Sequence, residues 1–218
     1  MNIIILNKSF GKFKNNKEII FYYLKVKEDF EELKKIIIEK KPKNIISIDF
    51  AIPTSIKTNN NIIVIGKESI LFNSKPVTWS TPREDKWIES SRNLNLNISN
   101  ILERYGLEHY IGSGIQLKYS KNIQKRKNAI KWFRENIKVN FIDNNSAKLL
   151  EIISDLNLTD NYAFIRLLHK KTPIYNNEKN YEKFINYIYS IIFYKIISKK
   201  ILSKIRYTNL ILKLSKLN

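Results

Sequence analysis

The chain has 218 residues and no cysteine, which excludes disulfides, thiolate chemistry and cysteine-ligated zinc or iron–sulfur sites. Hydrophobic residues make up 43% of the chain, so it is a folded protein and not a disordered tail. The formal net charge of +19, from 39 Lys and Arg against 20 Asp and Glu, favours a polyanionic partner, nucleic acid ahead of an anionic membrane.

The first elements in chain order are two short strands. Residues 3–6, IIIL, form an apolar run, and residues 18–26, EIIFYYLKV, are rich in β-branched and aromatic side chains. The two strands are predicted to pair as a hairpin. The opening run is too short for a signal peptide, so we expect an intracellular protein, in a cytoplasm, an organelle or an infected cell with an AT-rich genome.

A helix and a buried strand follow. Apolar residues recur at helical spacing from Phe30 to Ile37, and Pro42 stops this helix because the residue before a proline is pushed out of the α region. Residues 44–51, NIISIDFA, then form a nearly continuous apolar run. This pattern is typical of a strand that is covered on both faces in a mixed or parallel sheet.

Beyond Pro53 the pattern predicts six more elements. They are a β-hairpin around Gly66, a helix closed by Gly106, a strand over 115–119, a basic helix over 121–137, and two helices over 146–158 and 159–171. Two Trp residues, Trp79 and Trp87, lie in a polar connecting segment before the helix that ends at Gly106.

The C-terminal part differs in character from the rest. From Lys170 to Asn218 there are eleven Lys and Arg against two Glu, and residues 181–205 read as a long helix that is apolar almost all round. Its apolar core is shorter than the roughly 20 residues that a bilayer crossing needs. We predict a basic helical extension that packs on the domain, and binding to a membrane surface is the alternative.

The acid Asp49 near the end of the buried strand has two interpretations. Residues at the carboxyl ends of strands face ligands in open α/β sheets, which favours a role in chemistry. Aspartate is also a favoured residue in turns, so Asp49 could cap the turn before Pro53.

A helix is followed by the segment EKKPKN and then by a strand that ends in an acid. This order resembles the central unit of the ribonuclease-H-like superfamily, in particular Holliday-junction resolvases of the RuvC type. IIILNKSFGKF resembles the opening strand, QKRKNAIKWFRENI the basic helix, and LNLTDNYAFIRLLHKK the closing helix. The resemblance implies an α/β fold with a ribonuclease-H-like mixed sheet flanked by helices over residues 1–172, and a basic helical extension over 173–218.

The resemblance also implies a divalent-metal-dependent nuclease that acts on DNA, with branched or junction DNA as the candidate substrate. Such enzymes use clustered carboxylates to hold Mg²⁺ or Mn²⁺. Asp49 and Asp160 would be the catalytic metal ligands, and Asp155 would be a substitute for Asp160. Asn7 stands where the family has an aspartate, and Phe164 stands where it has a further acid.

Basic side chains are the candidate contacts to phosphates. The residues concerned are Lys125, Arg126, Lys127, Lys131 and Arg134 of the basic helix, together with Arg83 and Arg92. The sequence SIDFAIP is similar to an Ile-Asp-x-Pro element in a second branch of predicted ribonuclease-H-like nucleases. In that branch an R…D…R pattern follows the element, and the residues that would match it here are Arg83, Asp85 and Arg92.

Two functions are therefore expected as alternatives. The first is the nuclease, which the resemblance implies to be a homodimer. The second is a non-catalytic structural protein that binds nucleic acid, such as an AT-rich organellar ribosomal protein, in which Asp160 is a helix N-cap and the positive charge binds the partner.

Overall fold

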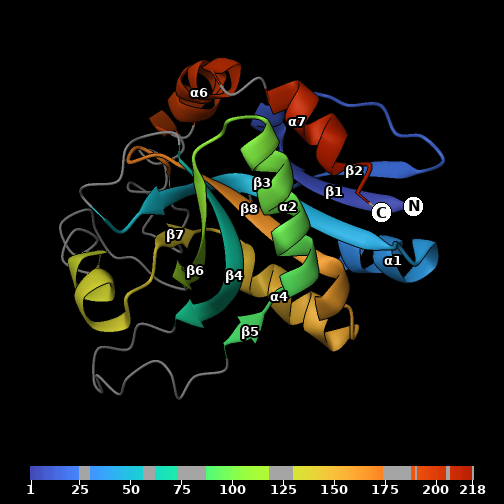
Figure 1. The fold of residues 1–218 in the computed structure, drawn as a ribbon, viewed down its shortest axis with the longest axis horizontal. Helices are drawn as coiled ribbons and strands as arrows, with labels where there is room; N and C mark the ends of the chain where they lie inside the picture. The colour runs from blue at the N-terminus through green and yellow to red at the C-terminus, as the bar shows by residue number, and fades with distance from the viewer. Residues whose placement is uncertain are drawn as a thin grey trace.

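The computed structural model describes residues 1–24, 30–55, 62–72, 87–117, 130–173, 188–189, 191–204 and 207–217. An eight-stranded mixed β-sheet forms the centre of the fold, and helices cover both of its faces (Figure 1). The coarse prediction of an α/β protein with a mixed sheet flanked by helices is confirmed.

The strands are β1 Asn2–Asn7, β2 Ile19–Leu24, β3 Asn44–Pro53, β4 Ile63–Phe72, β5 Ile88–Glu89, β6 His109–Leu117, β7 Phe141–Asp143 and β8 Tyr162–Leu168. The sheet order is β2-β1-β3-β7-β6-β4-β5, and β8 pairs with both β3 and β4. β3, β8, β4, β6 and β7 therefore pair in a closed ring. β1, β2, β3 and β8 are mutually parallel, so their carboxyl ends share one edge.

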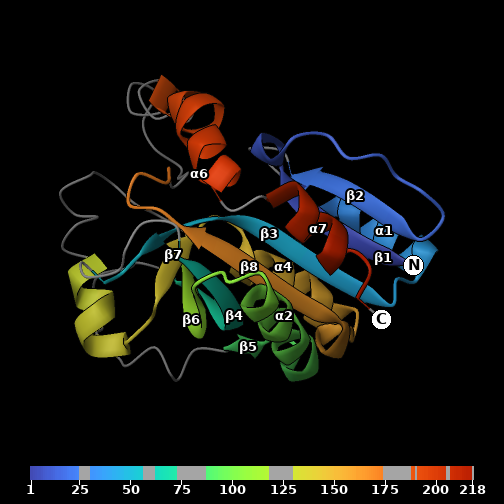
Figure 2. The ribbon, with the colours of Figure 1, turned by 45° about the horizontal axis from the view of Figure 1, so that its top comes forward.

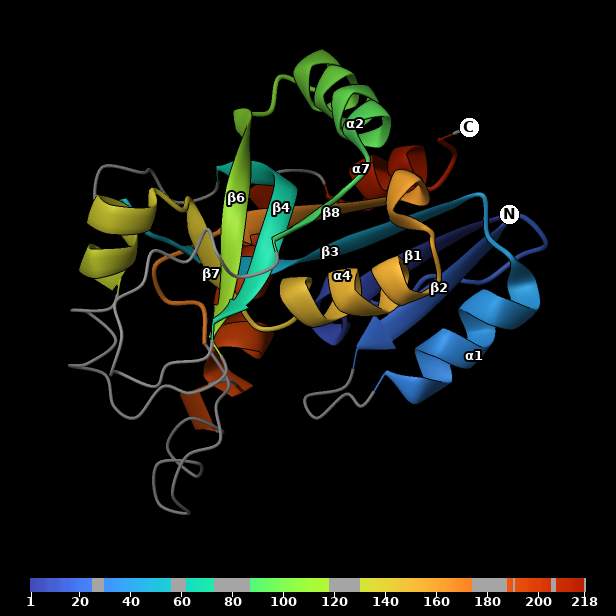
Figure 3. The ribbon, with the colours of Figure 1, turned by 90° about the horizontal axis from the view of Figure 1, so that it is seen from below.

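The helices are η1 Lys8–Phe10, α1 Glu31–Lys40, α2 Arg92–Arg104, η2 Phe133–Ile137, α4 Ser146–Asp155, η3 Thr159–Asn161, η4 Phe193–Ile197, α6 Ser198–Lys204 and α7 Tyr207–Leu214. Figure 3 shows α2 and α7 on one side of the sheet and α1 and α4 on the other. Successive side chains along a strand point to opposite faces of the sheet, so they contact different layers of helices.

Two cores follow from this alternation in β3. Ile46, Ile48 and Phe50 belong to the core under α2 and α7, whereas Ile45 and Ala51 belong to the core under α1 and α4. Every residue of β3 is buried, as expected for a central strand with both faces covered. The predicted helix over 30–41 and the buried strand at 44–51 are confirmed as α1 and β3.

Three predicted elements are wrong. The strands β1 and β2 are parallel and do not form a hairpin. The segment around Gly66 is one strand, β4, with a register shift between Gly66 and Glu68. The segment predicted as a closing helix over 159–171 contains β8, because its apolar run Tyr162–Leu168 is buried on both sides between β3 and β4.

The C-terminal helices pack on the α2 side of the sheet. Leu202 of α6 and Leu210, Ile211 and Leu214 of α7 join the same core as α2 and β3. In Figure 2, α6 projects outward beside α7. Among the described residues, no helix is long and apolar enough to cross a membrane. The division of the chain at residue 172 stays a prediction.

Candidate functional site

The shared carboxyl edge of β1, β3 and β8 is the candidate site, because ligands in α/β folds bind where parallel strands end. Two groups of side chains meet there on opposite faces of β3. Asp49 points toward the side of α4, and the next residue, Phe50, points toward the C-terminal helices. The first group is polar and the second is aromatic.

The polar group is centred on Asp49, whose side chain is only 3% exposed. Its Oδ1 accepts a hydrogen bond from the backbone N–H of Phe50 at 2.8 Å, and its Oδ2 accepts one from Nδ2 of Asn145 at 2.6 Å. Asn145 directly precedes α4, so this bond ties the central strand to the start of a helix. Both carboxylate oxygens are thus used within the protein.

A buried ion pair extends the polar group. Nε of Arg166 donates to Oδ2 of Asp143, and Nη2 of Arg166 donates to Oδ1 of Asn145 at 2.7 Å. Arg166 is 0% exposed and Asp143 is 1% exposed. Oδ1 of Asp143 accepts a further bond from the hydroxyl of Ser146 at 2.7 Å. Asp49, Asn145, Arg166 and Asp143 therefore form one continuous chain of hydrogen bonds.

Burial controls the charge states in this chain. Loss of solvent raises the pKa of Asp49 from 3.8 to about 6, although Arg166 and the two hydrogen bonds oppose the rise. Burial alone would lower the pKa of Arg166, but the combined attraction of Asp143, Tyr162 and Asp49 outweighs it and raises that pKa above its ordinary value. The arginine therefore stays charged, and Asp49 is the member of the group that titrates near neutral pH.

The aromatic group lies on the other face of the same edge. Phe10 follows β1 and stacks on Phe50 with ring centroids 5.2 Å apart, and Phe193 meets Phe50 edge-on at 5.4 Å. Tyr194 lies 6.2 Å from Phe50, and His169, directly after β8, lies 5.6 Å from Phe193. Phe10, Phe50 and Phe193 are buried, whereas Tyr194 and His169 are half-buried.

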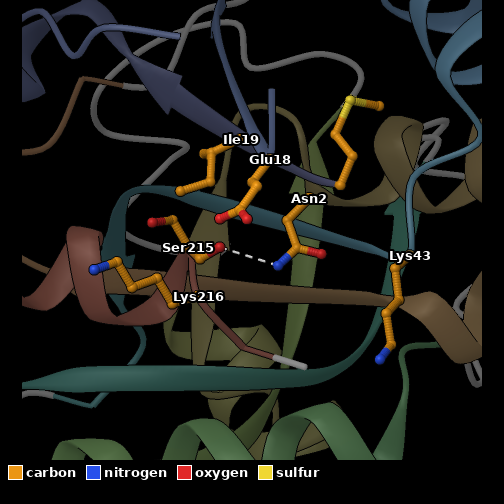
Figure 4. Close-up of a pocket in the computed structure, with 7 residues that line it drawn as sticks. Asn2, Glu18, Ile19, Lys43, Ser215 and Lys216 are labelled. Carbon is orange, nitrogen blue, oxygen red and sulfur yellow. Dashed lines mark hydrogen bonds between the residues drawn. The ribbon is translucent and has the colours of Figure 1, made fainter. Parts of the chain in front are cut away.

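Two open cavities lie elsewhere on the described part of the fold. One of about 440 Å³ lies where the N-terminus meets the end of α7, and it includes Asn2, Glu18 and Ser215 (Figure 4). The other, of about 530 Å³, is lined by Trp87, Glu68 and other residues near β4 and β6. Neither cavity is lined by Asp49 or Arg166, so neither opens onto the polar group.

The predicted metal ligands are not brought together. Asp160 is an exposed residue of η3, just before the start of β8, whereas Asp49 lies level with Arg166, six residues further along. At about 3.3 Å per strand residue, the part of β8 from Tyr162 to Arg166 alone separates these levels by about 13 Å. Asp155 ends α4 on the surface. The side chain of Asn7 accepts a bond from the N–H of Ser9, as a helix N-cap does.

Among the described residues, no group of three or more His, Cys, Asp or Glu is arranged to hold a metal ion. The expectation of Mg²⁺ or Mn²⁺ stays a prediction. Of the basic residues expected to contact phosphates, Lys131 precedes η2, Arg134 lies within η2 and Arg92 starts α2, and all three are exposed. The others, Arg83, Lys125, Arg126 and Lys127, lie outside the described residues, as does Asp85.

Asp143, Asn145 and Arg166 were not predicted from the sequence. One signal for Arg166 was present: it is the single charge in the apolar run YAFIRLL, and a charge in a buried strand needs a partner. Asp143 ends the short strand β7 and Asn145 follows it, but nothing local connects them to Arg166 or Asp49. Their meeting depends on the pairing of β3 with β7 and β8.

The chain resembles solved nucleosidase structures in fold. No protein-family model and no curated protein sequence matches it. A Campylobacter jejuni 5′-methylthioadenosine/S-adenosyl homocysteine nucleosidase aligns over 100% of both chains with a TM-score of 0.64 and 13% identity. The Helicobacter pylori nucleosidase of the same name aligns over 95% of this chain and 100% of its own, with a TM-score of 0.60 and 14% identity.

A third neighbour is a futalosine hydrolase mutant of Helicobacter pylori, which aligns over 95% of this chain and 99% of its own with a TM-score of 0.59 and 13% identity. At these identities the likeness shows the fold alone. It overturns the resemblance to ribonuclease-H-like resolvases, and the predicted nuclease function, with its association with DNA recombination, is wrong. The prediction failed because the segment interpreted as the closing helix of a nuclease is the strand β8.

Proposed function

We propose that this protein binds a nucleoside at the carboxyl edge of β1, β3 and β8. Support comes from the fold, which the chain shares along nearly its whole length with proteins described as nucleosidases and as a futalosine hydrolase. The edge is also the place where parallel strands of α/β proteins present ligands. The proposal concerns small nucleosides, in keeping with the substrates that those descriptions name.

The observation that carries the proposal is the aromatic group at this edge. A purine has two flat faces, and stacking on an aromatic side chain contributes about 1–3 kcal/mol per base in nucleic-acid complexes. Tyr194 and His169 are half-buried, so these two members of the aromatic group are partly exposed to solvent. Burial, followed by the charge of Lys171, lowers the pKa of His169, which keeps its imidazole neutral and suited to stacking at neutral pH.

Hydrolysis of the N-glycosidic bond is a second candidate function, which the pKa of Asp49 favours and its position on the face of β3 opposite to the aromatic group opposes. Glycosidic cleavage passes through an oxocarbenium-like transition state, and a carboxyl group whose pKa lies near the working pH can protonate the leaving group. A pKa of about 6 suits Asp49 to this role. Its burial opposes the role, since Asn145 and the Phe50 N–H occupy both oxygens.

Isothermal titration calorimetry tests binding. 5′-Methylthioadenosine and adenosine should bind, and free ribose should not. Tyr194→Ala should weaken nucleoside binding about tenfold, the factor that corresponds to about 1.4 kcal/mol of stacking. The matched control is Tyr105→Ala, which removes a tyrosine that is 42% exposed at the end of α2. Absence of nucleoside binding, or equal affinities of the two variants, would overturn the proposal.

The same mixtures decide the second candidate. Chromatography detects adenine released from 5′-methylthioadenosine during incubation with the protein. Release that disappears in Asp49→Asn, while calorimetry still shows nucleoside binding, supports hydrolysis. Nucleoside binding without release of adenine would show that the protein binds nucleosides and does not hydrolyse them.

A further inference from the structure

The outer face of the C-terminal helical segment carries a row of exposed isoleucines. Ile188, Ile192 and Ile196 are 43%, 45% and 61% exposed. They are spaced four residues apart, so they lie on successive turns of one helix face. Phe193 and Leu202 of the same helical segment are buried and already join the core. We call the three exposed side chains the isoleucine stripe, and none of them belongs to a core cluster of the described residues.

Positive charge accompanies the stripe. Lys195 and Lys199 are exposed on the same stretch of helix. From Ile188 to Asn218 the sequence holds seven Lys and Arg and no Asp or Glu. The stretch thus combines an apolar stripe with a charge of one sign. Figure 2 shows α6, which follows the stripe in the chain, projecting from the rest of the fold.

The charge discriminates between the partners that could cover the stripe. A second copy of the chain that docked by the same face would bring Lys195 and Lys199 of one copy toward those of the other, and like charges repel. A nucleic acid would meet the lysines with its phosphates, but it offers no apolar surface to the isoleucines. An anionic lipid bilayer offers both, with negative headgroups above a hydrocarbon interior.

We propose that this face binds peripherally to an anionic lipid bilayer. The isoleucine stripe enters the boundary between headgroups and acyl chains, as the apolar face of an interfacial helix does. Lys195 and Lys199 extend their aliphatic stems along that boundary and place their ammonium groups among the anionic headgroups. The proposal does not depend on nucleoside binding, because the stripe contains none of the rings of the aromatic group.

Sedimentation with lipid vesicles tests the proposal on the full chain. The protein should sediment with vesicles of phosphatidylcholine mixed with phosphatidylglycerol, and much less with vesicles of phosphatidylcholine alone. The double variant Ile192→Ser, Ile196→Ser should weaken binding about tenfold, because it removes apolar area that would leave water. Lys195→Gln should weaken it about fivefold, which corresponds to about 1 kcal/mol per basic residue near the surface.

The control for the isoleucine variant is Ile38→Ser, which changes an isoleucine that is 53% exposed on α1. It should bind like the parent. All substitutions are at exposed positions, and thermal melts verify that each variant folds. Equal binding to both kinds of vesicle, or equal loss in Ile38→Ser and the stripe variant, would overturn the proposal. A dimer in light scattering that the stripe variant dissociates would overturn it in favour of self-association.

Discussion

Asn145 donates a hydrogen bond from Nδ2 to Oδ2 of Asp49 at 2.6 Å, although 96 positions of sequence separate the two residues. The same amide accepts a bond at Oδ1 from Arg166, so each side of the amide has a fixed partner. Asn145 therefore connects an acid of β3 with a guanidinium of β8 and holds both at the start of α4. These hydrogen bonds connect β3, β8 and the start of α4 in a buried region, where water cannot replace a hydrogen-bond partner that is lost.

Stability should fall as the pH rises through the range in which Asp49 ionises. Burial raises the pKa of Asp49 from 3.8 to about 6, so the folded protein binds more protons than the unfolded chain between these pH values. A pKa difference of about 2, at about 1.4 kcal/mol for each pH unit, means that this group lowers the free energy of unfolding by about 3 kcal/mol between roughly pH 4 and pH 6. Urea denaturation at a series of pH values measures the slope.

Asp49→Asn should remove that part of the slope, since the amide does not titrate. It should also lower stability at every pH, because one of its N–H groups would face Nδ2 of Asn145. Asp160→Asn, at an exposed position of η3, is the control for the loss of one negative charge. A slope that survives in Asp49→Asn would show that Asp49 does not titrate in this range.

Breaking the buried ion pair should cost far more than breaking an exposed one. Arg166→Met leaves the Asp143 carboxylate buried without its charged partner, which typically costs 3–5 kcal/mol of unfolding free energy. Lys67→Met breaks the exposed pair with Glu68, whose atoms are 3.1 Å apart, and should cost less than about 1 kcal/mol. Chemical denaturation measures both.

A double-mutant cycle separates the pair from the packing around it. Arg166→Met combined with Asp143→Leu removes both charges, and the double variant should be more stable than Arg166→Met alone. If the two substitutions were simply additive, the ion pair would contribute nothing beyond the volume of its side chains.

The expected elements were correct where local patterns decide them and wrong where pairing decides them. The helix at 31–40 has a clear helical period and a proline boundary, and the strand predicted at 44–51 is a nearly continuous apolar run after that proline; both are present. The run YAFIRLL is apolar without a clear period, and such a run does not distinguish a buried strand from a helix. Its identity as β8 comes from β3 and β4, which lie on either side of it.

The candidate site was predictable only in part. Asp49 was correctly singled out as the acid of a buried strand, because its neighbours in sequence are apolar. The partners expected for it, Asp155 and Asp160, are on the surface, whereas the side chains that surround it are Asn145 and Arg166. Register between distant strands selects those partners, and one sequence carries no local trace of that register.

Gly66 should not tolerate a methyl group. A Cβ built at this position would lie 2.0 Å from Cε2 of Phe164, a fully buried ring on the neighbouring strand β8. Because the ring is enclosed by the core, Gly66→Ala should lower the free energy of unfolding by about 1–3 kcal/mol. Phe164→Leu introduced together with Gly66→Ala should recover part of that loss, since the shorter side chain frees the space.

Gly106→Ala is the matched control. Gly106 has a φ of +63°, and a Cβ there would meet nothing within 4 Å, so the substitution strains the backbone without a steric clash. Its cost should be about 1 kcal/mol, and Phe164→Leu should not reduce it. Thermal melts of the four variants compare the two sites, and recovery at both positions would contradict the steric explanation for Gly66.

The C-terminal turn should loosen when Asn2 loses its amide. Nδ2 of Asn2 donates to the carbonyls of Ser215 and Leu217 at 3.0 and 2.7 Å, beside the cavity in Figure 4. Asn44 donates to Leu217 as well, at 3.0 Å. Asn2→Ala leaves one of these three bonds, and since the cavity admits water, the free energy of unfolding should fall by about 1 kcal/mol.

Hydrogen exchange should quicken at the amides of Ser215 and Leu217, which bond within this turn. Asn136→Ala, which removes a local bond in η2, should leave that exchange unchanged. Exchange at Ser215 and Leu217 that stays slow in Asn2→Ala would mean that helix packing alone holds the C-terminal turn.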